Sequence, residues 1–237
     1  KKTPTLSPTE QQELMNILLS EQNGLCYIFI LNTGLRPGEN GGIKWKHYSY
    51  KESNIKVRDN YGKITYYDDN FKKIESTYEE KDLKTASSYR TIPLQKWLNE
   101  LMHLFMISEM KQKGYTSKEQ MEDNYIFVNN LGNPLSSDYL WDTLDRMLKR
   151  HNFKHVSVYQ LRHLFATRCV DVHIPINQVQ QYLGHTLGST TVDFYVDYDE
   201  ETNKKEIEKL ETINNINVLP EKLKDISSVL LMGQKVI

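Results

Sequence analysis

Residues 54–94 differ in pattern from the rest of the chain, and this difference constrains the fold more than any other feature of the sequence. The segments 55–58 and 64–67 are rich in β-branched and aromatic residues, which favour strands, and Tyr61-Gly62 suits a turn between them. Residues 90–94 form a further short strand pattern. Because the segments on both sides have apolar residues at helical spacing, the sequence predicts a mostly α protein with a small antiparallel β-sheet, in the α+β class.

Helical patterns occupy most of the remaining chain. The first begins at Ser7-Pro8, where serine suits the N-cap and proline the first helical position. Residues 25–31 form a short buried apolar stretch, and a turn over 33–39 leads into a helix that carries Ile43 and Trp45. Further helices are expected from 95 onward and over 136–150, 159–172, 175–183, 188–196 and 200–214, with a last one after Pro220. We expect residues 1–199 to form one domain and residues 200–237 a C-terminal helical tail.

The composition excludes several classes of protein. No apolar run approaches the roughly 20 residues that a membrane span needs, and the first residues lack the apolar core of a signal peptide. Aromatic residues make up 11% of the chain, which argues against disorder. Cys26 and Cys169 lie far apart without metal-ligand spacing, so neither a disulfide framework nor a metal site is expected. These features fit a reducing cytoplasm. The formal net charge is −1, so binding to nucleic acid would require positive charge concentrated on one face.

Four short motifs contain the residues best suited to chemistry. Residues 159–167 read Tyr-Gln-Leu-Arg-His-Leu-Phe-Ala-Thr, and they are followed by Leu-Gly-His at 183–185 and by Thr190-Thr191 and Tyr195. Upstream, residues 33–39 read Thr-Gly-Leu-Arg-Pro-Gly-Glu. Between these motifs, Lys84-Thr85 precedes Ser-Tyr-Arg-Thr-Ile-Pro-Leu at 88–94. Any one of these motifs alone would be a weak signal, but four in this order over about 165 residues are a strong one.

In these motifs the chain resembles the tyrosine recombinases of the phage-integrase family, and especially the integrases of conjugative transposons. The resemblance implies the catalytic-domain fold of that family and an enzyme that integrates or excises a mobile element. Its members attack a DNA phosphate with a tyrosine oxygen, form a 3′-phosphotyrosyl link and free a 5′-hydroxyl. They need neither ATP nor a metal, so no cofactor is expected, and side chains must neutralise the reacting phosphate.

The resemblance assigns a role to each motif residue. Arg36 and Arg162 would clamp the phosphate, and Glu39 would orient Arg36 or simply favour a helix N-terminus. Lys84 would protonate the leaving 5′-oxygen, with Lys81 as a nearby rival. His185 would donate to the phosphate or steer the nucleophile, although a histidine that caps a turn is the alternative. Tyr195 would be the nucleophile, ten residues after His185; many relatives have nine, where this chain has Phe194, and Tyr198 is a rival.

Tyr159 departs from the family pattern, which usually has histidine three residues before the second arginine. The spacing puts Tyr159 on the same helix face as Arg162. A phenol exchanges hydrogen bonds with a phosphate, but it does not readily take a proton at pH 7. We therefore expect Tyr159 to keep the phosphate contact and to lose any role as a base. A packed aromatic residue is the alternative interpretation.

The resemblance also implies partners. They are double-stranded DNA recombination sites, a homotetramer in the synaptic complex and an accessory DNA-bending or directionality protein, all at the bacterial nucleoid. Whole integrases carry a core-binding domain, so this chain is expected to correspond to the catalytic domain. The narrow stripe Ile207, Leu210 and Ile213 fits docking on the chain's own domain or on a neighbouring protomer. The basic side chains expected near the DNA backbone are Lys44, Lys46, Arg146, Lys149 and Arg150.

Two alternatives remain. A type IB topoisomerase-like enzyme, which only nicks and reseals DNA, has a similar set of residues, but Leu-Gly-His and the Thr-Thr pair favour a recombinase. Tyr159 is the one feature that favours a decayed, non-catalytic DNA-binding module. The intact basic residues and Tyr195 argue against such decay.

Overall fold

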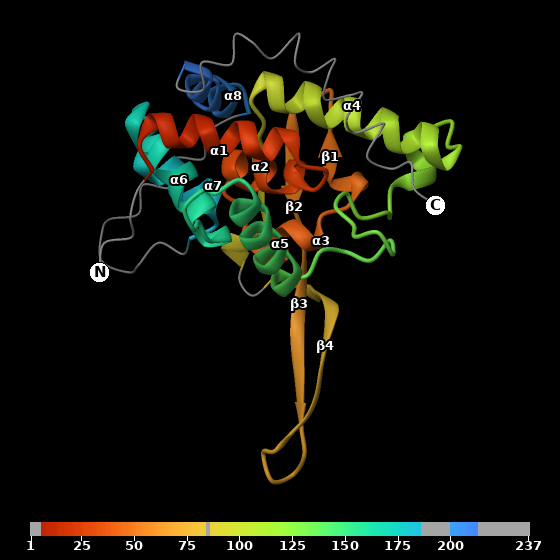
Figure 1. The fold of residues 1–237 in the computed structure, drawn as a ribbon. Coiled ribbons are helices and arrows are strands. Elements are labelled where there is room, and N and C mark those ends of the chain that lie inside the picture. The colour runs from red at the N-terminus through yellow and green to blue at the C-terminus, as the bar shows by residue number, and fades with distance from the viewer. Residues whose placement is uncertain (1–5, 84–85, 186–199, 213–237) are drawn as a thin grey trace.

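The computed structural model describes residues 6–83, 86–185 and 200–212. Its elements pack as a helical body around a small sheet, with one long hairpin that projects from it (Figure 1). The fold class predicted from the sequence is confirmed. In chain order the elements are α1 (Pro8–Ser20), α2 (Gly24–Thr33), α3 (Pro37–Gly42), η1 (Trp45–His47), β1 (Tyr48–Ser49), β2 (Asn54–Val57), β3 (Asp59–Tyr67), β4 (Lys73–Asp82), η2 (Ala86–Ser88), β5 (Arg90–Pro93), α4 (Lys96–Lys113), η3 (Lys118–Met121), α5 (Ser137–Arg150), α6 (Val158–Asp171), α7 (Ile176–Leu183), α8 (Glu200–Glu208) and η4 (Lys209–Thr212), where η marks a 3₁₀ helix.

Local sequence signals explain where several helices begin and end. Ser7 accepts a hydrogen bond from the Glu10 backbone N–H, and the Glu10 carboxylate accepts from the Ser7 backbone N–H, so α1 begins with a capping box. Ser157 begins α6 in the same way. The helices α2 and α7 both end at a glycine in the left-handed region, Gly34 with φ +67° and Gly184 with φ +64°. These two ends place the motif residues that follow them.

The central sheet is antiparallel, with strand order β1-β2-β5. Ile55 lies opposite Ile92, and Val57 lies opposite Arg90. Ile55, Val57 and Ile92 are completely buried, so this face of the sheet belongs to the core. The expected strands near 55–58 and 90–94 are therefore present. No helix among the described residues has the length and apolar character that crossing a membrane requires.

The β3–β4 hairpin differs from the prediction. Tyr61-Gly62 was expected to turn, but both residues lie inside β3, where Gly62 pairs with Glu79. The turn comes later, after Tyr67, where the Asp68 carboxylate accepts hydrogen bonds from the Asn70 and Lys72 backbone N–H groups. Because the Asp68 side chain satisfies the backbone N–H groups of the turn, the two strands remain paired as far as this Asx-type turn. The hairpin is inserted between β2 and β5 and projects away from the helices (Figure 1).

The helix α3 has a glycine face on which the base of the hairpin rests. A Cβ at Gly42 would lie 2.9 Å from backbone atoms of Asp59 and Asn60, and a Cβ at Gly38 would lie 2.3 Å from the Asn60 side-chain oxygen. A Cβ at Gly41 would lie 2.3 Å from the Leu135 carbonyl oxygen. Gly41 and Gly42 follow Gly38 by three and four residues, so the three glycines lie on the same side of this short helix. They allow the backbone of β3 to cross α3 in direct contact.

Gly41→Ala should therefore destabilise the protein by about 3 kcal/mol, because the clash is with backbone that cannot turn aside. The measurement is urea unfolding. Gly114→Ala is the matched control, since its φ is +69° but nothing lies within 4 Å of its Cβ position; backbone strain alone should cost about 1 kcal/mol there. A loss at Gly41 no larger than that at Gly114 would contradict the close packing of α3.

The other segments follow the prediction with exceptions. The apolar stretch 25–31 lies within α2, in which every residue is buried. Ile43 and Trp45 were expected on the helix after Pro37, but α3 ends at Gly42 and both residues pack into the core beyond it. The glycine pair at its end explains the early stop. The expected helix over 188–196 and the one after Pro220 lie outside the described residues.

The described part of the expected C-terminal tail packs on its own domain. Ile207 and Leu210 are completely buried in a cluster with Phe165 and Tyr182. Asn203 accepts hydrogen bonds through its side-chain oxygen from Gln178 and Tyr182. Residues 200–212 therefore cover α6 and α7 within the same chain. Ile213, the third member of the apolar stripe, lies outside the described residues.

Candidate functional site

Side chains from four separate segments meet beside the C-terminal end of α7. Arg36 is the N-cap of α3, Arg90 begins β5, Arg162 lies on α6 and His185 follows α7. The structure therefore brings together three residues that sequence reasoning selected, Arg36, Arg162 and His185, from positions up to 149 residues apart. Arg90 lies among them as well.

Arg36 is the most accessible of the three guanidinium groups, with 34% of its side chain exposed. Its backbone N–H and its Nη1 donate to the two oxygens of Glu39, at 2.8 and 2.6 Å, so the carboxylate both caps α3 and orients the side chain. Its Nη2 donates to the Gly184 carbonyl at 2.9 Å. Glu39 is 2% exposed, and burial alone would raise its pKa. The hydrogen bonds and charges of Arg90, and then those of Arg36, outweigh burial and hold the pKa of Glu39 below its ordinary value.

Arg162 lies deeper, at 8% exposure, and joins two turns. Its Nη1 donates to the Gly34 carbonyl and its Nη2 to the Leu183 carbonyl, both at 2.6 Å. Burial and the neighbouring charge of Arg36 lower the pKa of Arg162 to about 10, so the group remains a cation at neutral pH. It therefore presents a fixed positive charge between the ends of α2 and α7.

Three consecutive carbonyls at the end of α7 each accept a hydrogen bond from a different arginine. The Tyr182 carbonyl binds Arg90 Nε at 2.6 Å, and the next two carbonyls bind Arg162 and Arg36. The negative end of the helix dipole adds to this attraction. A Cβ at Gly184 would lie 2.9 Å from Arg90 Nη1, which explains the glycine of the Leu-Gly-His motif together with its positive φ.

His185 lies 3.0 Å from Arg162, measured from its Nε2 to Nη2. Because a guanidinium group only donates, Nε2 must accept this hydrogen bond, and the ring proton then resides on Nδ1. Burial, and then the charges of Arg162 and Arg36, lower the pKa of His185 below its ordinary value of 6.5. The free site therefore contains a neutral imidazole next to two guanidinium groups.

In the free protein at pH 7, His185 should be neutral with its proton on Nδ1, and should remain so somewhat below pH 6.5. Since the folded-state pKa lies below the unfolded one, protonation favours unfolding, and stability should fall as the pH drops below 6.5. Nitrogen-15 NMR of the imidazole rings measures the tautomer, and His185→Gln identifies the signal and should flatten this part of the pH dependence. A doubly protonated ring at pH 7 would contradict the geometry.

Tyr159 stands one turn before Arg162 on α6, and 52% of it is exposed. Its ring packs against the exposed Trp141 of α5, with 5.8 Å between ring centroids and a tilt of 53°. The structure thus places Tyr159 at the open edge of the site rather than in the core. Its position is compatible with a contact to a phosphate bound by Arg162.

The other predicted catalytic residues lie outside the residues that the structure describes. Lys84, Tyr195 and the rival Tyr198 all lie in ranges that the structure does not describe. Lys81, the rival of Lys84, lies near the end of β4, where its Nζ donates to the Lys63 carbonyl at 2.7 Å. The Lys81 ammonium group is therefore hydrogen-bonded within the hairpin.

Lys44 and Lys46 differ in their surroundings. Lys44 is 9% exposed, and its Nζ donates to both oxygens of Glu80 on β4, at 2.8 and 2.6 Å. Tyr125 donates to the same carboxylate at 2.7 Å. These contacts hold the β3–β4 hairpin against the rest of the domain. Because Glu80 already neutralises the buried Lys44, a DNA contact for Lys44 is disfavoured. Lys46 is on the surface and pairs with Asp123 at 2.8 Å.

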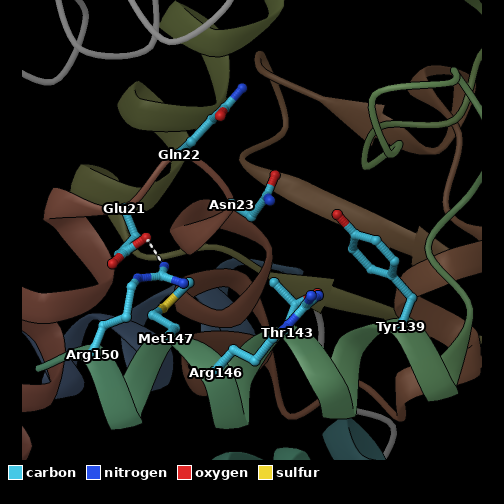
Figure 2. Close-up of a pocket in the computed structure, with 8 residues that line it drawn as sticks. All are labelled: Glu21, Gln22, Asn23, Tyr139, Thr143, Arg146, Met147 and Arg150. Carbon is cyan, nitrogen blue, oxygen red and sulfur yellow. Dashed lines mark hydrogen bonds and ion pairs between the residues drawn. The ribbon is translucent and has the colours of Figure 1, made fainter. Parts of the chain in front are cut away.

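The remaining predicted basic residues lie on the second half of α5, where Arg146 and Arg150 line a cavity of about 280 Å³ (Figure 2). Arg150 pairs with Glu21 across the cavity at 2.6 Å. Arg146 donates to the Asp142 carbonyl and to the Thr143 hydroxyl, and within the described part of the chain it pairs with no carboxylate. Lys149 is outside the cavity and pairs with Asp145 at 2.6 Å. Arg146 therefore brings an uncompensated positive charge to a concave surface.

Sequence reasoning assigned no role to Arg90. A signal was present, because Arg90 is two residues before the buried Ile92 and strand side chains alternate between faces. An arginine at that position must point inward with Ile92, and a buried guanidinium group needs hydrogen-bond acceptors, of which a carboxylate is the strongest. Glu39 is that partner, at 2.8 Å.

Comparisons with known proteins identify similar chains. A tyrosine recombinase XerC-like protein of Caldanaerobacter subterraneus is 25% identical over 215 residues, which cover 90% of this chain and 54% of the relative. Transposase A from transposon Tn554 of Staphylococcus aureus is 26% identical over 213 residues, which cover 88% of this chain and 53% of the relative. The chain thus spans about half the length of these curated relatives.

The solved structures that resemble this one share its fold at low sequence identity. The Tn1549 transposon integrase in complex with transposon right end DNA has a TM-score of 0.61 and 20% identity, covering 89% of this chain and 68% of that chain. The XerA recombinase has a TM-score of 0.58 and 17% identity, covering all of this chain and 68% of that one. The profile of the phage integrase family matches residues 4–202. Because this match extends over most of the chain, the protein belongs to the phage integrase family.

Proposed function

We propose that the protein is the catalytic part of a site-specific tyrosine recombinase that integrates or excises a mobile genetic element. The observation that carries the proposal is the convergence of Arg36, Arg162 and His185 beside the end of α7. Two guanidinium groups and an imidazole at one open edge match the donors that a phosphate oxyanion needs. The chain's relatives include a transposon transposase, and a structural neighbour is a transposon integrase bound to DNA.

The reaction proceeds by in-line displacement at phosphorus. The Tyr195 oxygen bonds to the scissile phosphorus, while the bond from phosphorus to the 5′-oxygen breaks. Arg36 and Arg162 neutralise the equatorial oxygens, and Tyr159 adds a hydrogen bond at the open edge. Lys84 gives its proton to the leaving 5′-oxygen. When Arg162 Nη2 turns from His185 to the phosphate, the Nε2 atom of the neutral imidazole becomes free to receive the proton of the tyrosine. A 5′-hydroxyl from another strand then reverses the step and releases Tyr195.

The biological setting follows from this reaction. Exchange of both strands at two DNA sites breaks four phosphodiester bonds and therefore needs four active tyrosines, so the active form is a homotetramer on two recombination sites. An accessory DNA-bending protein would choose between integration and excision. The protein acts at the bacterial nucleoid, in the cytoplasm. Residues 1–199 with the docked α8 form the catalytic unit, and the segment after residue 212 contacts a neighbouring protomer.

The first experiment is covalent trapping on a nicked suicide duplex. A pool of candidate element ends is incubated with the protein, and the products are separated under denaturing conditions. A covalent adduct that maps to the peptide containing Tyr195, with no divalent metal added, supports strand cleavage. Strand exchange between two labelled duplexes then separates a recombinase from a topoisomerase-like enzyme that only reseals. DNA binding without an adduct would favour the decayed module.

We further propose that the α5 cavity binds a DNA backbone phosphate through Arg146, with Arg150 beside it (Figure 2). Lys46 and Lys149 add weaker surface contacts. Arg146→Gln should weaken binding to all duplexes about five- to tenfold and reduce the slope of log affinity against log salt concentration by about 1. Lys149→Gln removes the same charge outside the cavity and is the matched control. Equal losses in the two variants would show a general effect of charge and would contradict the cavity site.

A further inference from the structure

Glu39 is shared between two arginines, one of them partly exposed and the other buried. It accepts the backbone N–H and Nη1 of Arg36, and it accepts Nη1 and Nη2 of Arg90 at 3.1 and 2.8 Å. Arg36 is partly exposed at the open edge of the site, whereas the side chain of Arg90 is 3% exposed. Arg90 therefore contacts the carboxylate from the interior, where no substrate reaches it.

The charges of this cluster explain why a third arginine is needed. A buried carboxylate beside Arg36 would attract its guanidinium and cancel its charge, which is the charge that a phosphate must find. Arg90 offsets Glu39 from the far side. Three guanidinium groups and one carboxylate leave a net charge of +2, whereas Arg36 and Arg162 with Glu39 alone would leave +1.

Arg90 also fixes the turn that the other arginines bind. Its Nε donates to the Tyr182 carbonyl and its Nη1 to the Ser88 carbonyl, so β5 is tied to the end of α7. Gly184, whose carbonyl accepts from Arg36, packs directly against the Arg90 guanidinium. The buried Arg90 side chain thus neutralises Glu39 and also holds the turn at the end of α7 in position.

We infer that Arg90 is a positioning residue for strand cleavage: it neutralises Glu39 and so keeps Arg36 available to the scissile phosphate. The inference rests on the proposed function and adds a residue to it. Arg90 does not touch the DNA. It acts through Glu39, so its loss should slow cleavage at saturating DNA far more than it weakens DNA binding.

The test compares Arg90→Gln with the double variant Arg90→Gln/Glu39→Gln in single-turnover cleavage of a suicide duplex. Glutamine keeps an amide group that donates hydrogen bonds, and it removes the charge. Arg90→Gln should cleave on the order of 10²-fold more slowly than the natural protein, with DNA affinity changed less than about threefold. The double variant no longer has a carboxylate to compete for Arg36, and it should cleave about tenfold faster than Arg90→Gln.

The rescue is the decisive outcome, because a residue that only holds β5 to α7 would not be helped by a second change in the same cluster. A double variant as slow as Arg90→Gln, or slower, would overturn the inference. Arg90→Lys, which keeps the charge, should lose less activity than Arg90→Gln and covers the case in which the glutamine variant folds poorly. Thr91→Ala, exposed on the same strand, is the control and should cleave normally. Absence of an adduct with the natural protein would instead count against the proposed function itself.

Discussion

Tyr195→Phe is expected to abolish covalent trapping of DNA completely. Phenylalanine keeps the ring but lacks the oxygen that bonds to phosphorus, so no other property of the site can compensate. A tyrosine with an ordinary pKa near 10 attacks at neutral pH only in a positive environment or next to a base. The cluster of Arg36, Arg162 and neutral His185 supplies both. The measurement is the denaturing gel of a nicked suicide duplex, with binding checked separately on the intact duplex.

Tyr198→Phe is the matched control, since it removes a hydroxyl three residues away and should leave trapping intact. The ten-residue spacing from His185 is what selects Tyr195, and the same spacing excludes Phe194, which has no hydroxyl. An adduct that persists in Tyr195→Phe and disappears in Tyr198→Phe would move the nucleophile to Tyr198 and would overturn the spacing argument.

Arg162→Lys should reduce the rate of cleavage on the order of 10³-fold while DNA affinity changes only a few-fold. Lysine keeps the positive charge, but an ammonium group cannot bridge the Gly34 and Leu183 carbonyls and also reach a phosphate. It also withdraws the donor that fixes the His185 tautomer. The loss should therefore appear in the single-turnover rate at saturating DNA rather than in binding.

Thr167→Ala serves as the control for this variant, because among the described residues its hydroxyl bonds to the exposed His163 carbonyl of the same helix and to no other partner. It should cleave like the natural protein. If Arg162→Lys retained a rate within tenfold of the natural protein, charge alone would suffice at this position, and the forked geometry would not be needed.

Local patterns predicted most helices because their signals are contained in neighbouring residues. Ser7 with Glu10, Ser157 with Gln160, and the glycines after α2 and α7 define those ends without tertiary contacts. The meeting of Arg36, Arg162 and His185 was predicted only through the family resemblance. Nothing in the spacing of positions 36, 162 and 185 reveals that three segments end at one turn.

The features that sequence reasoning missed depend on contacts between distant segments. In the sequence, Lys44 looks like an ordinary charged residue, and only the folded hairpin shows that it pairs with Glu80. The hairpin itself was predicted wrongly because Tyr61-Gly62 resembles a turn. The glycines at 38, 41 and 42 contained a usable signal, since their spacing on one helix face indicates close backbone approach. Arg90 was overlooked because a single arginine in a strand usually faces solvent.

The insertion of the β3–β4 hairpin between β2 and β5 also has a kinetic meaning. Pairing of Val57 with Arg90 closes a long loop, and that closure costs entropy before any contact repays it. The β3–β4 hairpin, whose strands are joined by a tight turn, can form before β2 and β5 pair, because its own contacts are local. Once zipped, it shortens the remaining loop about fourfold, which saves about 1 kcal/mol of closure free energy. The same hairpin that projects from the finished molecule would then act early in folding, by bringing β2 and β5 into register.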